Sequence, residues 1–151
     1  MKTATCGYAN LGSITGSQRL AFLGPTLPVD IGFDPSYHPS NKAPPTPNVR
    51  GFDALVDTGA SQSCIDATLA MQLQLPIVNQ IKIAGAHGAG MLNVHVAQLY
   101  VPSLPHLMWG SFVGADLTGG GQPIRAILGR DFLRHFKMTY DGQSGMVTLE
   151  G

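Results

Sequence analysis

The sequence is poor in charge, in cysteine and in long apolar runs, and each shortage excludes a class of protein. Only 12% of its 151 residues are charged, and the acidic and basic side chains balance, so neither nucleic acid nor an anionic membrane is an expected partner. Cys6 and Cys64 are too few for a disulfide framework, and two free thiols are favoured over a single bridge. No apolar stretch approaches the length of a membrane span or of a signal-peptide core. We therefore expect a cytoplasmic protein.

Long helical periodicity is also scarce, whereas the chain has 19 glycines and 11 prolines. This combination indicates short strands joined by turns. The length favours one domain with its own core, which we place at residues 26–151. Residues 1–25 begin with a segment rich in Gly, Ser and Thr that lacks a clear period. We expect them to form either a flexible arm or an edge strand.

The first clear strand pattern begins at Thr26, where Leu27, Val29 and Ile31 alternate with other residues. Residues 34–48 follow and are rich in proline and turn formers, so they cannot form a central strand. We interpret them as a loop insertion. A long loop of this kind is either functional or a tolerated surface insertion. The chain then returns as a second strand, residues 50–56.

That second strand ends in the most informative stretch of the chain. The apolar run Ala54-Leu55-Val56 leads directly into Asp57, which is followed by Thr58 and Gly59. An unpaired ionised carboxylate is costly to bury, so Asp57 must find a partner, change its pKa or have a use. Glycine permits a tight loop and close approaches of the backbone. The pattern predicts that Asp57 lies on a loop at the end of a strand.

The rest of the chain alternates between further strands and short helices. Asp66 is a plausible N-cap for a helix over residues 67–75, which Pro76 ends. Two alternating strands, 77–83 and 91–101, flank a segment of Gly, Ala and one His, which has almost nothing to bury and should be mobile. A helix over 130–136 and a hairpin over 137–149 complete the chain.

A second apolar run, Ala126-Ile127-Leu128-Gly129, lies far downstream and continues as Arg130-Asp131. Together with Leu55-Val56-Asp57-Thr58-Gly59-Ala60-Ser61, it resembles the signature of aspartic peptidases. The order and spacing are similar to those of retropepsins, the single-lobe kind, and the helix after Asp66 is similar to cellular and bacterial members. The resemblance implies a mainly β, closed barrel-like acid protease fold, with one or two short helices and a flap hairpin over residues 81–96. Asp116-Leu-Thr-Gly119 is interpreted as a turn, not as a second catalytic motif.

The resemblance also implies a mechanism, in which two carboxylates share a proton and activate a water. The chain offers one such residue, Asp57, so the enzyme would be a homodimer in which Asp57 meets its symmetry mate. The expected activity is that of an aspartic endopeptidase that hydrolyses peptide or protein substrates without a cofactor. The alternative is a non-proteolytic domain of the same fold that binds peptides or mediates dimerisation. A third hypothesis is a self-processing precursor.

Residue roles follow from the resemblance, position by position. Thr58 would bond across the dimer axis, while Gly59 and Ala60 would line the cleft. Ala60 has no hydroxyl to bond the carboxylate, which predicts a working pH less acid than that of pepsin. Gly129 and Arg130 would be structural residues near the site. The residues assigned to the flap and substrate cleft are Gly85, Ala86, His87, Gly88, Ala89, Gly90, Arg125 and Ile127.

Two positions depart from the retroviral pattern. Ser61 stands where retroviral members have the Asp that pairs with the Arg of the Gly-Arg motif, so Arg130 needs another partner, either a carboxylate of the second chain or a carbonyl. Arg125 stands where those members present an apolar pocket wall, and it either makes that subsite less hydrophobic or faces outward on the surface.

The remaining chemistry-bearing residues form no compact set. The five histidines are scattered along the chain, and their spacing predicts no metal site. No serine or cysteine has a convincing base near it in the sequence, so a nucleophilic hydrolase is not predicted.

Overall fold

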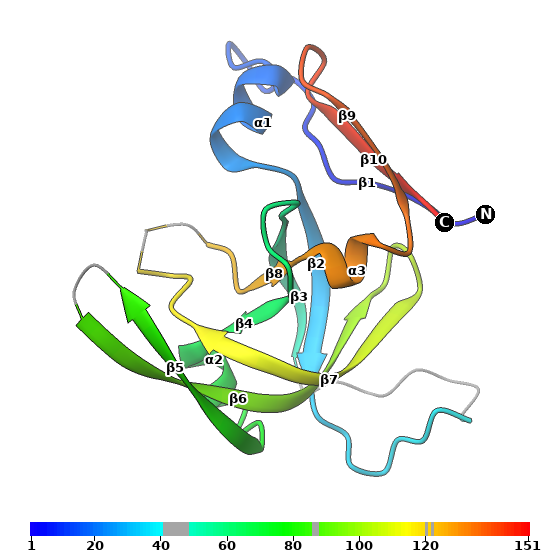
Figure 1. The fold of residues 1–151 in the computed structure, drawn as a ribbon. Helices are drawn as coiled ribbons and strands as arrows, with labels where there is room; N and C mark the ends of the chain where they lie inside the picture. Colours follow the sequence, from blue (N-terminus) through cyan, green and yellow to red (C-terminus); the bar gives the residue numbers. More distant parts are fainter. Residues whose placement is uncertain (41–48, 86–87, 120, 122) are drawn as a thin grey trace.

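The computed structural model describes residues 1–40, 49–85, 88–119, 121 and 123–151, and within them the fold is mainly β (Figure 1). Its helices are short. In chain order the elements are β1 (Thr3–Thr5), α1 (Gly16–Leu23), β2 (Thr26–Gly32), β3 (Val49–Val56), β4 (Cys64–Asp66), α2 (Ala67–Gln72), β5 (Ile77–Gly85), β6 (Gly88–Val101), β7 (His106–Ala115), β8 (Ala126–Leu128), α3 (Arg130–Leu133), β9 (Lys137–Asp141) and β10 (Met146–Glu150).

The predicted closed β-barrel is confirmed. Its strands follow the order β2-β3-β8-β4-β7-β6, and pairing between β2 and β6 closes the ring. β5 lies outside this ring and pairs with β6 alone. Two pairings are parallel, β3 with β8 and β4 with β7, and the others in the barrel are antiparallel. Two separate parts of the chain are thereby brought side by side at β3 and β8.

The strand predicted to begin at Thr26 is β2, and its alternation follows the burial. Leu27, Val29 and Ile31 are 1%, 0% and 0% exposed. They join a single core with residues of β3, β6, β8 and the terminal strands. Burial of such side chains stabilises the fold by about 1.5–3 kcal/mol each.

The helix predicted after Asp66 is present as α2, with the predicted cap. The carboxylate of Asp66 accepts a hydrogen bond from the Leu69 backbone N–H at 3.1 Å. The helix ends at Gln72 and not at residue 75, because Gln74 has a φ of 53° and leaves the helical region. The predicted helix over 130–136 is likewise shorter, since α3 ends at Leu133.

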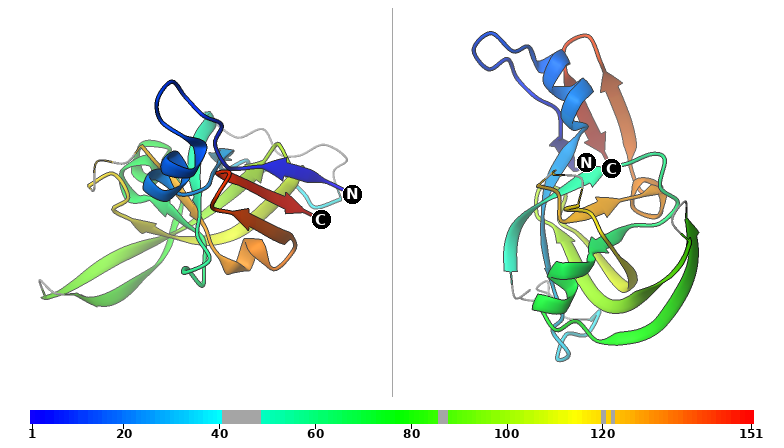
Figure 2. Two further views of the ribbon diagram at one scale, coloured as in Figure 1. Left: turned by 90° about the horizontal axis from the view of Figure 1, so that it is seen from above. Right: turned by 90° about the vertical axis from the view of Figure 1, so that its left-hand side faces the viewer.

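The N-terminal segment forms one element that was predicted and one that was not. Thr3–Thr5 forms an edge strand, β1, which pairs with β10 and completes the sheet β1-β10-β9 beside the barrel (Figure 2). The unpredicted element is α1, which packs near β10. Its sequence signal was a capping box, in which Thr15 accepts from the Gln18 N–H and the Gln18 side chain accepts from the Thr15 N–H.

Parts of two predicted loops lie outside the described residues. These are residues 41–48 of the predicted 34–48 insertion and residues 86–87 of the predicted flap. Residues 34–40 contain turns and no strand, as expected for the proline-rich segment. In the described part of the chain, the helices are all too short or too polar to cross a membrane.

Asp66 provides a test of this packing, because its buried carboxylate has three partners. Besides the Leu69 N–H, it accepts from the Leu117 N–H at 3.2 Å and from Arg125 Nη1 at 3.3 Å. Asp66→Ala should lower the free energy of unfolding by about 2–4 kcal/mol, since it removes a cap and leaves buried donors unpaired. Asp116→Ala, at an exposed turn, is the matched control and should cost less than about 1 kcal/mol. Urea denaturation measures both, and equal effects would contradict the assignment.

Candidate active site

Asp57 follows directly on β3, where that strand lies beside β8. The parallel register pairs Leu55 with Ile127 and Val56 with Leu128. The Asp57 N–H continues this ladder and donates to the Leu128 carbonyl at 2.9 Å. On the other side of β3, the Val56 N–H donates to the Pro25 carbonyl at 2.8 Å. The backbone that carries Asp57 is therefore fixed from both sides, as the predicted strand-end loop requires.

The loop after Asp57 leaves the carboxylate half-buried, with one hydrogen bond among the described residues. Its Oδ1 accepts from the Gly59 N–H at 2.8 Å, while Oδ2 has no hydrogen-bond partner among the described residues. A Cβ atom at position 59 would lie 3.0 Å from Oδ1, so glycine suits this close turn. Thr58 and Gly59 are exposed and Ala60 is half-buried. No hydrogen bond within the described part of the chain involves the Thr58 hydroxyl.

Arg130 supports this loop by two hydrogen bonds to its backbone carbonyls. Its Nη1 donates to the Thr58 carbonyl at 2.8 Å, and its backbone N–H donates to the Ala60 carbonyl at 2.8 Å. Two partners were predicted for Arg130, a carboxylate of the second chain or a carbonyl. The structure shows a carbonyl, that of Thr58 in the same chain. The predicted proximity of the Gly129-Arg130 motif to the Asp57 loop is thus present in the structure, on the side of the loop backbone.

A second support of the loop was missed by the sequence analysis. Ser63 donates from its N–H and its hydroxyl to Asp131 Oδ1, at 3.0 and 2.7 Å, and its hydroxyl oxygen accepts from the Gly129 N–H at 3.0 Å. Ser63 is 3% exposed. This network ties the end of the Asp57 loop to the start of α3. The available signal was Asp131 itself, an acidic residue beside Arg130 in a chain that lacks the expected acid at Ser61.

Arg125 and Ile127 are placed differently from each other. The guanidinium of Arg125 pairs with the buried carboxylate of Asp66 at 3.3 Å, which favours a structural role over a place in the cleft wall. Ile127 is half-buried in β8, between Leu55 of β3 and Cys64 of β4. It is thus one ladder position before the residue that bonds Asp57.

The predicted flap corresponds to the hairpin of β5 and β6. Gly85 pairs with Gly88, Ala84 with Ala89 and Ile83 with Gly90, whereas Ala86 and His87 lie outside the described residues. Figure 2 shows this hairpin extending away from the barrel. Several large apolar side chains on it are exposed, namely Ile77, Val78, Ile83 and Met91. The described part of this hairpin thus carries exposed apolar surface on both of its strands.

Other reactive groups near the site are unsuited to chemistry at neutral pH. Burial raises the pKa of the Cys64 thiol to about 11, and the nearby carboxylates of Asp57, Asp131 and Asp66 add to the shift. The thiol therefore stays protonated and is a poor nucleophile. Cys6 is also a free, buried thiol. The described residues contain no group of three or more His, Cys, Asp or Glu side chains that could hold a metal ion.

Comparisons with known proteins agree with this geometry. The model of the family described as "gag-polyprotein putative aspartyl protease" matches residues 46–135, which include Asp57 and Gly129. No curated protein matches the sequence. Among solved structures, a retropepsin-like aspartic protease from Rickettsia conorii is 13% identical, with a TM-score of 0.54 over 97% of this chain and 89% of that one.

Two viral proteases are also similar, at lower TM-scores. The EIAV protease complexed with the inhibitor HBY-793 is 20% identical, with a TM-score of 0.46 over 74% of this chain and 86% of that chain. The simian foamy virus (mac) protease is 13% identical, with a TM-score of 0.47 over 72% and 91%.

Gly129 tests the close packing behind the Asp57 loop. A Cβ atom there would lie 2.8 Å from the Ala60 carbonyl oxygen and 2.8 Å from the Gln62 carbonyl carbon, and both are backbone atoms that cannot swing aside. Gly129→Ala should therefore lower the free energy of unfolding by about 1–3 kcal/mol or more. Gly110→Ala is the matched control, because a Cβ at Gly110 meets nothing within 4 Å. Thermal unfolding of both variants measures the difference, and a fully stable Gly129→Ala would contradict the geometry.

Proposed function

The chain belongs to the retropepsin-like family of gag-polyprotein aspartyl proteases, and we propose that it is an aspartic endopeptidase that acts as a symmetric homodimer. The observation that carries the proposal is the Asp57 loop. Its backbone is held by β8, Pro25 and Arg130, while its carboxylate is half-buried with one oxygen unpartnered within the described chain. A carboxylate kept in place but not consumed by structural bonds is what proton transfer requires.

The proposed reaction is water attack on a peptide bond. Asp57 of one chain, ionised, accepts a proton from a water that lies between the two chains. Asp57 of the other chain, protonated, donates a hydrogen bond to the scissile carbonyl oxygen. Two carboxylates close enough to bind the same water cannot both be ionised, so the pair holds one shared proton. The C–N bond of the tetrahedral intermediate then breaks as the proton taken from the water passes to the leaving amine nitrogen, which leaves a carboxylic acid and a free amine.

Dimerisation is proposed because one chain offers one suitable carboxylate. Thr58 is exposed beside Asp57, and its hydroxyl has no partner within the described chain, so it is available to a second copy. In Figure 1 the loop after β3 rises from the barrel towards α1. On and before α1, Phe22, Leu11 and Ile14 are 82%, 62% and 51% exposed and line one groove. Because α1 ends at Leu23 and the Pro25 carbonyl accepts from the Val56 N–H just before Asp57, this exposed apolar surface belongs to the segment that adjoins Asp57, which supports an interface there.

The hairpin of β5 and β6 is proposed as the flap. Its glycines, Gly85, Gly88 and Gly90, permit backbone movement at the tip. Its exposed apolar side chains, including Ile83 and Met91, would be covered when it closes over an extended peptide. Closure would exclude water other than the attacking molecule, which strengthens the electrostatic interactions inside the site.

The catalytic assignment predicts the outcome of one substitution. Asp57→Asn keeps the shape and the acceptor for the Gly59 N–H but removes the titrating group, so cleavage of a denatured protein or a mixed peptide library should fall by at least about 10²–10⁴-fold. The assay runs from pH 3 to 7 at several protein concentrations. Wild-type cleavage should rise faster than linearly with concentration if the dimer is the active form.

Absence of cleavage at every pH, from a protein shown to be folded and dimeric, would contradict the proposed activity. It would instead favour a non-proteolytic peptide-binding domain of this fold. Cleavage that survives in Asp57→Asn would point to a contaminating enzyme or to another catalytic residue.

The proposed interface predicts a second outcome. Phe22→Asp places a charge in the apolar surface of α1 and should raise the dissociation constant of the dimer by about tenfold or more. Met71→Asp is the matched control, because Met71 is 56% exposed on α2 and is not part of that surface. Analytical ultracentrifugation measures both, in an Asp57→Asn background that prevents self-digestion. Dimers equally stable in both variants would remove α1 from the interface.

A further inference from the structure

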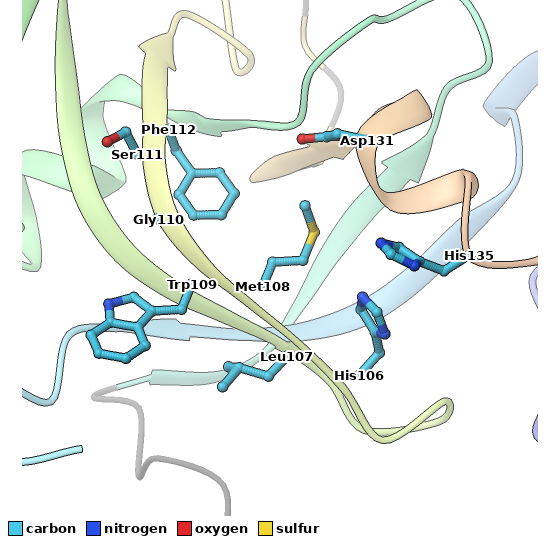
Figure 3. Close-up of a pocket in the computed structure, with 9 residues that line it drawn as sticks. All are labelled: His106, Leu107, Met108, Trp109, Gly110, Ser111, Phe112, Asp131 and His135. Carbon is cyan, nitrogen blue, oxygen red and sulfur yellow. The ribbon is translucent and has the colours of Figure 1, made fainter. Parts of the chain in front are cut away.

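An open pocket of about 360 Å³ lies beside β7, and neither Asp57 nor any residue of β5 lines it. Seven consecutive residues of β7, His106 to Phe112, line it, together with Asp131 and His135. Figure 3 shows Met108 and Phe112 between β7 and α3, with the two histidine rings at one end. Consecutive residues of a strand alternate between its two faces. Because residues of both faces line the pocket, the edge of β7 forms one of its walls.

Within the described ranges, this edge of β7 has no partner strand along most of its length. β6 pairs with residues 106–113 on one side, whereas β4 covers only residues 113–115 on the other. In an antiparallel pair, every second residue directs its N–H and C=O away from the partner strand. Within the described part of the chain, no other element or side chain bonds to the backbone of residues 106–112. Among the residues that the structure describes, the pocket therefore presents a row of backbone donors and acceptors without partners.

The faces of β7 beside this edge are largely apolar. A Cβ atom added at Gly110 would meet nothing within 4 Å, so the face that carries Met108 and Phe112 is open between them. On the face towards α3, Met108 is half-buried and Phe112 is 4% exposed. On the other face, Leu107 is half-buried and Trp109 is 45% exposed. An added strand would place alternate side chains against these two apolar faces.

The charges around the pocket favour an uncharged occupant. Asp131 already accepts from the Ser63 N–H and hydroxyl and from the Phe132 N–H. Burial lowers the pKa of His106, and nearby His135 and Lys2 lower it further, so His106 is neutral at pH 7. Backbone hydrogen bonds, apolar contacts and the uncharged hydroxyl of Ser111 are therefore available to a ligand on β7.

We propose that the edge of β7 over residues 107–111 is a second peptide-binding site, which binds an extended, uncharged, aliphatic peptide by strand addition. Free edge groups give such a site its affinity, and pockets for alternate side chains give it selectivity. The site differs from the proposed catalytic cleft in its lining, since neither Asp57 nor any residue of β5 lines it, and it adjoins the Asp57 loop through Asp131 and Met108, which contact Ser63. It does not depend on whether the protein cleaves peptides.

The probe for the first test is the capped peptide acetyl-Val-Thr-Val-Thr-Val-amide, which is uncharged and has high strand propensity. It is titrated into ¹⁵N-labelled protein carrying Asp57→Asn, so that no cleavage occurs. Backbone amide shifts and protection from hydrogen exchange should concentrate on residues 107–111. Changes confined to the β5–β6 hairpin and the Asp57 loop would overturn the proposal, as would the absence of any change.

Two matched pairs separate strand addition from loose apolar binding. Gly110→Leu places a large side chain on the open face between Met108 and Phe112, where the side chains of an added strand would lie, and should weaken binding by about tenfold or more, whereas Gly110→Ala should change it little. On the ligand side, N-methylation of residues 1, 3 and 5 or of residues 2 and 4 removes alternate donors. One of these two patterns should abolish binding and the other should not, because only one set faces β7.

Equal binding of the two methylated peptides would overturn strand addition even if a variant protein failed to fold. Loss of the 107–111 amide signals with protein concentration alone would mean that the edge pairs with a second copy, and would also overturn the proposal. If the wild-type protein cleaves denatured substrates but fails these tests, only the proposed second binding site is overturned. If the protein binds the probe at residues 107–111 but cleaves nothing, only the proposed peptidase activity is overturned.

Discussion

The structure depends on the parallel pairing of β3 with β8, which ends in the hydrogen bond from the Asp57 N–H to the Leu128 carbonyl. Residues more than seventy positions apart in the chain meet there, so β3 and β8 must pair before this bond can hold Asp57 in place. The core around β2 and β3 provides the free energy that holds a carboxylate in this half-buried position. What the fold produces at this point is a fixed loop with a carboxylate that few structural bonds occupy.

Several of the chain's charged side chains support that loop or the elements beside it. Arg130 bonds to the Thr58 carbonyl, Asp131 holds Ser63 and through it Gly129, and Asp66 pairs with Arg125 at the cap of α2. Each of these partners is local to the site or to the strands that flank it. Because the supporting bonds go to backbone groups and to other side chains, Asp57 retains a free oxygen within the described chain. In the proposed dimer that oxygen would face the second copy.

Much of the fold and the position of Asp57 could be predicted from sequence, because the signals are local. The alternation of Leu27, Val29 and Ile31, the cap at Asp66 and the apolar runs before Asp57 and Gly129 all depend on nearest neighbours. The partner of Arg130 and the pairing of Arg125 with Asp66 could not be chosen, because both depend on which segments meet in space. The helix α1 is a different case, since its capping box at Thr15 and Gln18 was present but lay in a segment without periodicity.

The central claim is that each active site takes one Asp57 from each of two chains, and mixing tests it most directly. Wild-type protein is held at a fixed concentration at which it is mostly dimeric, and increasing amounts of Asp57→Asn are added after brief dissociation and reassembly. If the site is shared, mixed dimers are inactive, and activity per wild-type chain should fall steadily towards zero as the variant is added in excess. Activity that stays constant at every ratio would show that one chain is sufficient, and would contradict the account.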